Sequence, residues 1–215
     1  QIKLLFLLAS ASVTGAFAQS NGLTDMSQSR YAKMANTGID AVHWTNGFWG
    51  ERFNVFSGTS LQSMWNTWNT PEVSHGFRNF EIAAGVCKGE HWGPPFHDGD
   101  MYKWMEGVAS VYAVNKDPEL DKLMDYFIAC VVKAQRVDGY IHTPVIIEEL
   151  NKGIDSHTQA DSQQQTVIGT KVGSEDEKGA FANRLNFETY NLGHLMMAGI
   201  VHHRATGKTT LFDAA

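Results

Sequence analysis

The chain has 215 residues, of which 43% are hydrophobic and 19% are charged, a balance typical of a globular protein and not of a disordered one. Its formal net charge is −6 and it has no cluster of basic residues, which argues against nucleic acid or an anionic membrane as the main partner. This length suffices for one ordinary domain with a buried core.

Residues 1–18 have the pattern of a signal peptide. Lys3 precedes an apolar run at residues 4–8, and Ala16 and Ala18 form a small-residue cleavage site before Gln19. The apolar run is too short to cross a bilayer, and no other run approaches that length. We therefore expect a protein that is exported to the periplasm or the extracellular space, with no stable membrane insertion.

Two cysteines remain in the mature chain, Cys87 and Cys130. An oxidising compartment permits a disulfide between them, but a lone buried thiol is a common core residue, and we favour two free, buried thiols. Neither a C-x-x-C nor an H-E-x-x-H motif occurs, so the sequence predicts no metal site within this chain.

The predicted elements begin with a polar lead-in at residues 19–40, followed by ordered structure. A helix is predicted at residues 51–69, with Gly58 weakening its continuity, and a short helix at 77–84 is closed by Gly85.

An acidic stretch at residues 96–107, FHDGDMYKWMEG, then joins a loop to an amphipathic helix. Asp98 or Asp100 is predicted to cap that helix, because a short carboxylate accepts hydrogen bonds from the free N–H groups of a first turn. Apolar residues follow at helical spacing and are expected to face the core: Met101, Trp104, Met105, Val108 and Tyr112.

The clearest helix signal is Asp117 followed by Pro118, an N-cap before proline at the first helical position. Residues 140–184 are polar and Gly-rich without a helical stripe, and short strands are predicted there at 145–147 and 166–168. Helices are predicted again at 186–205 and from Thr209 or Thr210 onward.

Residues 111–120 and 202–211 share one pattern, in which a tight polar turn joins two helices. Short turns at one end and long loops at the other are typical of an α/α toroid, whose long-loop end usually carries the function. Two hairpins cannot close such a ring. The sequence therefore predicts an all-α fold that is the first part of a larger toroid, with a long irregular insertion that is β-containing if the two strands form.

Several short segments resemble, in their joint order, glycoside hydrolase family 127, the β-L-arabinofuranosidases. They are RNFEIAAG (78–85), the acidic stretch (96–107), QRVDGY (135–140), NFETYNLGHL (186–195) and ATGK (205–208). The resemblance implies that residues 41–215 are the N-terminal part of a six-hairpin glycosidase domain, an (α/α)6 barrel that continues beyond Ala215.

One position departs from the family pattern. The family commonly has a histidine where Phe187 stands, so a different substrate or membership of the sister family 146 is an alternative.

Five residues in the matching segments are predicted to bind substrate, and none is predicted to be catalytic: Asp98, Asp100, Glu188, Tyr190 and His194. Tyr190 and His194 are four residues apart and share a helix face, whereas an ordinary structural histidine is the alternative for His194. His202 and His203 are expected to be surface residues.

The resemblance also implies a catalytic centre in which zinc holds a cysteine thiolate nucleophile, with a glutamate as general acid/base. Zinc suits this role because it keeps a thiol deprotonated at neutral pH. Cys87 and Cys130 lie outside the family's catalytic motif, so that centre and its zinc are expected beyond Ala215, and this fragment alone is expected to be inactive.

The expected function of the full protein is exo-acting β-L-arabinofuranosidase activity on plant-derived glycans, with an oligosaccharide or polysaccharide as partner. Two alternatives stay open: a non-catalytic carbohydrate-binding toroid, and another (α/α)6 enzyme such as a polysaccharide lyase or an unsaturated-sugar hydrolase.

Overall fold

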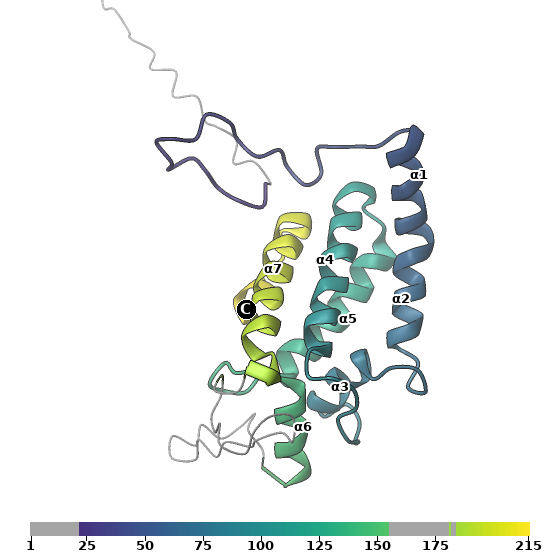
Figure 1. Ribbon diagram of the computed structural model, residues 1–215, viewed down its shortest axis with the longest axis vertical. Coiled ribbons are helices and arrows are strands. Elements are labelled where there is room, and N and C mark those ends of the chain that lie inside the picture. The colour runs from purple at the N-terminus through teal and green to yellow at the C-terminus, as the bar shows by residue number, and fades with distance from the viewer. Residues whose placement is uncertain (1–21, 155–180, 182–183) are drawn as a thin grey trace, which may run out of the picture.

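The computed structural model describes residues 22–154, 181 and 184–215. These residues form helices without any strand among them, which confirms the predicted all-α class (Figure 1). In chain order the elements are α1 (Gly47–Val55), η1 (Phe56–Ser60), α2 (Leu61–Trp68), α3 (Gly76–Ala83), α4 (His97–Asn115), α5 (Pro118–Ala134), α6 (Thr143–Asn151), η2 (Arg184–Asn186), α7 (Glu188–Thr206) and α8 (Thr210–Ala214). The predicted signal peptide at 1–18 and the predicted strand at 166–168 lie outside the described residues.

The described part of the lead-in, residues 22–40, contains no helix. The first long helical segment, which we call the first rod, follows it and consists of α1, η1 and α2. α1, η1 and α2 continue into one another, and η1 is a π-helical turn that contains Gly58. The backbone of Leu61 on α2 accepts a hydrogen bond from Trp104 Nε1 on α4 at 3.3 Å, which fixes this rod against the core. The helix predicted at 51–69 is therefore present, and Gly58 marks a local change of helix type and not a break.

Two helical hairpins follow, as their shared turn pattern predicts. In the first, Asp117 accepts a hydrogen bond from Glu119 N at 2.9 Å and so caps α5, while Lys116 takes a left-handed conformation with φ 55° between α4 and α5. In the second, Gly207 ends α7 with φ 79°, a conformation that glycine adopts without steric cost, and α8 begins at Thr210.

The two hairpins stack so that α4 and α7 run parallel, side by side (Figure 1). Near their first turns Gly99 N donates to Asn191 Oδ1 at 3.0 Å, and near their last turns Lys116 Nζ donates to Ala205 O at 2.9 Å. α5 packs behind α4 and contacts α8, and Lys208 ties the second hairpin to α5 through Asp121 and Asp125. Of the described loops, those between α3 and α4 and between α5 and α6 therefore lie at the N-terminal ends of α4 and α7, which we call the long-loop end, and the two hairpin turns lie at the opposite end.

The core is built around α4. Met101, Trp104 and Met105 are fully buried there, as is Val108, and they pack with aromatic rings from α3 and α5 that include Phe127. The helical spacing predicted this face, except that Tyr112 at its far end is only partly buried. Burial of each large apolar side chain contributes roughly 1.5–3 kcal/mol, so this helix is the main anchor of the fold.

One predicted strand is wrong. Residues 145–147 lie in helix α6, where Val145, Ile146 and Ile147 are buried. A short apolar run has the same pattern in a buried helix as in a buried strand, and here Pro144 in the first turn and a carboxylate from α4 favour the helix.

The expectation for His202 is also wrong, because its side chain is fully buried, whereas His203 is partly buried. α7 packs against α4 on one side and α8 on another, so two adjacent positions on it both meet neighbours. Cys130 is buried and Cys87 is half-buried, and both are free thiols. Within the described part of the chain, no helix combines the length and the apolar character that a bilayer crossing requires.

Candidate functional site

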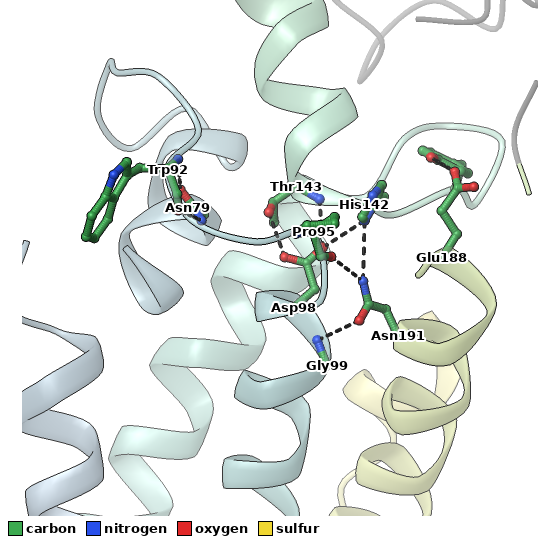
Figure 2. A network of polar contacts seen from close by, with 10 residues as sticks. Asn79, Trp92, Pro95, Asp98, Gly99, His142, Thr143, Glu188 and Asn191 are labelled. Atoms are coloured by element: carbon green, nitrogen blue, oxygen red, sulfur yellow. Dashed lines mark hydrogen bonds and ion pairs between the residues drawn. The ribbon is translucent and has the colours of Figure 1, made fainter. Parts of the chain in front are cut away.

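The N-terminal ends of α4, α6 and α7 meet at the long-loop end of the bundle, where buried polar side chains join them (Figure 2). Asp98, in the first turn of α4, accepts hydrogen bonds from Thr143 N at 2.8 Å and from Thr143 Oγ1 at 2.6 Å. His142 Nδ1 lies 3.4 Å from the same carboxylate. Because Thr143 is the first residue of α6, Asp98 caps α6 from a distant part of the chain.

The prediction that Asp98 or Asp100 caps α4 is therefore wrong. The N-cap position of α4 is Phe96, and it has no side-chain cap. The cap comes from α7 instead, where Asn191 Oδ1 accepts from Gly99 N at 3.0 Å and Asn191 Nδ2 donates to Pro95 O at 2.9 Å. Asp98 points toward α6 because its carboxylate accepts a hydrogen bond from the free N–H group at the start of that helix.

The electrostatics of Asp98 follow from this arrangement. Burial of the side chain, which is 1% exposed, acts to raise the pKa of its carboxyl group, but hydrogen bonds from His142 and Thr143 outweigh that effect and hold the pKa below its ordinary value. Asp98 thus remains ionised inside the protein. It holds α4 and α6 together and has no surface on which a ligand could bind.

The loop before α4 is fixed by Asn79, a buried residue of α3 that the sequence analysis did not select. Its Nδ2 donates to Trp92 O at 3.0 Å, and its Oδ1 accepts from Trp92 N at 3.3 Å (Figure 2). Burial lowers the pKa of His91, beside Trp92 in this loop, to about 4. Its position in the family-like segment RNFEIAAG is the sequence feature that could have marked Asn79 as a candidate site residue.

Glu188, in the first turn of α7, anchors a second loop. Its Oε1 accepts a hydrogen bond from the hydroxyl of Tyr140, and its Oε2 accepts from Phe181 N at 2.7 Å. Burial and the Glu188 carboxylate raise the pKa of Tyr140 well above its usual range. With only 5% of its surface exposed, Glu188 is a positioning residue in this arrangement.

The other three predicted site residues are accessible and lie together. Asp100 Oδ1 binds Lys103 Nζ at 2.8 Å, Lys103 Nζ lies 5.0 Å from the centre of the Tyr190 ring, and the Tyr190 and His194 rings are 4.7 Å apart. His194 Nδ1 in turn lies 3.4 Å from Glu106 Oε1. We call these residues the α4–α7 strip: Asp100, Lys103, Glu106, Tyr190 and His194.

Sequence reasoning missed two members of this strip, Lys103 and Glu106. Both belong to the acidic stretch, and their spacing from Asp100 places all three on one face of α4. The face carries carboxylate, ammonium, phenol and imidazole groups, which donate and accept hydrogen bonds in the way that recognition of a hydroxylated ligand requires.

The described residues do not offer a metal or thiolate centre. Among them, no group of three or more His, Cys, Asp and Glu side chains is placed to hold a metal ion. Burial raises the pKa of the Cys130 thiol to about 11 and also raises the pKa of Cys87, so both thiols stay protonated at neutral pH. The donor set of this part of the chain does not fit zinc.

Comparison with known proteins places the chain in a family. The profile described as β-L-arabinofuranosidase, GH127 catalytic domain, matches residues 41–215. A non-reducing end β-L-arabinofuranosidase from Bifidobacterium longum subsp. longum is 31% identical over 142 residues, which are 66% of this chain and 18% of that protein.

Solved structures agree with this match. A glycoside hydrolase shares 64% identity and superposes with a TM-score of 0.56, covering 91% of this chain and 21% of its own. A GH127 β-L-arabinofuranosidase from Geobacillus stearothermophilus T6 shares 31% identity with a TM-score of 0.62, covering 80% of this chain and 24% of its own. A GH127 β-arabinofuranosidase at 24% identity, with a TM-score of 0.62 and coverage of 82% and 25%, shares the fold.

Stacked helical hairpins with long loops at one end, together with these matches, define the N-terminal portion of an (α/α)6 barrel of the glycosidase class. The chain belongs to glycoside hydrolase family 127, the family of β-L-arabinofuranosidases. It spans about a fifth to a quarter of the length of the relatives that it matches.

Proposed function

We propose that the full protein is an exported, exo-acting β-L-arabinofuranosidase that removes terminal sugar residues from plant-derived glycans. Membership of family 127 supports the reaction class, and the names of the relatives support the sugar. The part described here contributes one wall of the sugar-binding site, and the α4–α7 strip is that wall.

The observation that carries this proposal is the position of the strip. Asp100, Tyr190 and His194 come from two parallel helices and lie on one accessible face at the long-loop end. α5 and α8 cover the other side of α4 and α7, so in a closed ring of hairpins the strip is directed toward the ring axis. Neutral and charged hydrogen-bonding groups beside an exposed tyrosine ring suit a sugar with several hydroxyl groups.

The chemical step needs residues from the rest of the protein. A retaining glycosidase uses a nucleophile and an acid/base on opposite sides of one anomeric carbon. The thiols of this chain are protonated, and its acidic side chains on the strip are engaged by Lys103 and His194. We therefore place the thiolate, its zinc and the acid/base glutamate, which the family resemblance implies, in the remaining sequence.

Metal analysis and an assay with a chromogenic β-L-arabinofuranoside test this proposal on two proteins, the full-length one and residues 19–215 alone. The full-length protein is expected to turn over the substrate and to contain stoichiometric zinc, while the shorter one is expected to be inactive and zinc-free. Zinc-independent turnover by residues 19–215 would show that the catalytic centre lies within these residues and not in the remaining sequence. Binding of L-arabinose-containing oligosaccharides without turnover by the full-length protein would favour the non-catalytic alternative.

A further inference from the structure

Glu106 is a carboxylate of the α4–α7 strip whose contacts point to one partner. It lies on the third turn of α4, its side chain is 25% exposed, and its Oε1 is 3.4 Å from Nδ1 of His194 on α7. The hydroxyl of Ser110, one turn along, donates to the backbone carbonyl of Glu106 and not to its carboxylate.

The other charged groups of the strip are engaged elsewhere. Lys103 Nζ binds Asp100 at 2.8 Å and lies over the ring of Tyr190, at 5.0 Å from its centre. Asp100 is thereby neutralised by a lysine of its own helix, whereas Glu106 faces across to α7. The ring of His194 is held from two sides, by Glu106 at Nδ1 and by the Tyr190 ring at 4.7 Å.

The second nitrogen of His194 has a different environment. No described residue makes a hydrogen bond to Nε2, and this atom is not among the buried polar atoms that lack a partner. The side chain of His194 is 30% exposed, so Nε2 is the part of the ring that solvent or a ligand reaches. A carboxylate on Nδ1 fixes the tautomer in which Nδ1 carries the proton and Nε2 accepts a hydrogen bond.

We propose that Glu106 is a positioning residue that holds the Nδ1–H of His194 and thereby presents Nε2 to a hydroxyl group of the bound sugar. The proposal rests on the function proposed above, since it assigns the sugar contact to that same strip. Partial burial raises the pKa of the Glu106 carboxyl group, and the contact with His194 offsets only part of that effect.

Steady-state kinetics of the full-length protein test the kinetic consequence. His194→Ala is expected to raise KM about tenfold, the effect of losing one hydrogen bond to a ligand. Glu106→Ala is expected to raise KM by a similar factor with a smaller change in kcat, and Glu106→Gln, whose amide oxygen still accepts the Nδ1–H, is expected to recover most of that loss. The double variant is expected to have the same KM as His194→Ala alone, because the two residues act as one unit.

A matched control is Glu81, another partly buried glutamate, which binds Arg78 at 3.0 Å and Tyr126 at 2.8 Å on α3 and α5, away from the strip. Glu81→Gln is expected to leave KM unchanged. A loss in Glu106→Ala that repeats in full in the His194→Ala background, or a Glu106→Ala variant as harmless as Glu81→Gln, would overturn the proposal.

A second measurement does not depend on turnover. Ring-nitrogen NMR of ¹⁵N-histidine-labelled protein, with His194 assigned by its loss in His194→Ala, is expected to show Nδ1 protonated in the parent protein and a tautomer mixture in Glu106→Ala. If the tautomer is the same in both, Glu106 does not position the ring. Failure of the parent protein to cleave the arabinofuranoside would instead count against the proposed function, so the two failures are distinguishable.

Discussion

The side chain of Asn191 on α7 caps α4 by accepting a hydrogen bond from Gly99 N at 3.0 Å, across 92 residues of sequence. The same side chain donates to Pro95 O at 2.9 Å, so it also holds the loop that enters α4. Asp98, one residue before Gly99, caps α6 in the same way through Thr143. The starts of α4 and α6 are thus each completed by a neighbouring element, which couples the loops to the packing of the helices.

Replacement of Asn191 by alanine tests this coupling. Because the residue is 2% exposed, Asn191→Ala leaves a buried N–H and a buried carbonyl without partners, at a cost of about 1–3 kcal/mol for each group. We expect a clear fall in the midpoint of thermal or urea-induced unfolding. Thr189→Ala, at an exposed position of the same helical turn, is the control and is expected to change stability by less than about 0.5 kcal/mol. Equal effects of the two substitutions would contradict the capping role.

Two glycines in helices provide a matched pair. A Cβ at Gly99 would lie 2.7 Å from Asn191 Oδ1 and 2.9 Å from a ring carbon of Tyr190, whereas a Cβ at Gly193 meets nothing within 4 Å. Alanine in an open helical position stabilises by about 0.5–1 kcal/mol, so Gly193→Ala is expected to raise the melting temperature. Gly99→Ala is expected to lower it and to raise KM, since Tyr190 must move. Stabilisation by both substitutions would show that α7 does not approach α4 this closely.

The two aspartates of the acidic stretch are expected to respond differently to Asp→Asn substitution. Asp98→Asn breaks a buried, hydrogen-bonded ionic cluster, and we expect a loss of stability on the order of 3 kcal/mol. Asp100→Asn removes a partly exposed ion pair that is worth about 0–1 kcal/mol, so its main effect is expected in KM. Unfolding and kinetics measured on both variants separate the two roles. A stable Asp98→Asn variant with impaired turnover would show that Asp98 contacts substrate after all.

Buried histidines are expected to make stability depend on pH. Burial lowers the pKa of His91 and of His202 from 6.5 to about 4. The unfolded chain therefore binds more protons than the folded one in this range, and the free energy of unfolding is expected to fall as the pH drops from about 6.5 to about 4. Above pH 6.5 these two residues do not make the free energy of unfolding depend on pH. Asp98, whose pKa is also lowered in the folded state, adds a further loss only below its ordinary value of 3.8.

His202→Leu isolates one of these groups. Both ring nitrogens of His202 lack a hydrogen-bond partner among the described residues, so an apolar side chain of similar size is expected to be tolerated or stabilising. Urea-induced unfolding as a function of pH is expected to show a shallower decline for this variant than for the parent protein. An unchanged decline would mean that His202 is already accessible to protons in the folded state.

Export is tested by the mass of the secreted protein. The pattern of Lys3, the apolar run at 4–8 and the small residues at 16–18 predicts cleavage before Gln19. Mass spectrometry of periplasmic or culture-medium protein is expected to find Gln19 at or near the N-terminus. A mature protein that retains residues 2–8 would rule the signal peptide out.

The sequence by itself determined the features that depend on neighbours a few residues apart. Asp117 and Pro118 predicted the start of α5, and the apolar spacing from Met101 predicted the buried face of α4. The spacing of four residues between Tyr190 and His194 predicted that their rings lie together. Caps, helical stripes and i, i+4 pairs are local interactions, so their residue types and spacing carry enough information.

Only the tertiary structure decided which polar side chains are anchors and which face a ligand. Asp98 and Glu188 are buried because distant segments pack over them: Thr143 of α6 contacts Asp98 across 45 residues of sequence, and Tyr140 contacts Glu188 across 48. Asp100, which has the same side chain as Asp98, and His194, another polar residue of α7, lie in the same two helices but stay accessible. Residue type could not separate the two groups, because the desolvation and hydrogen bonding of a polar side chain depend on elements that pack around it from elsewhere in the chain.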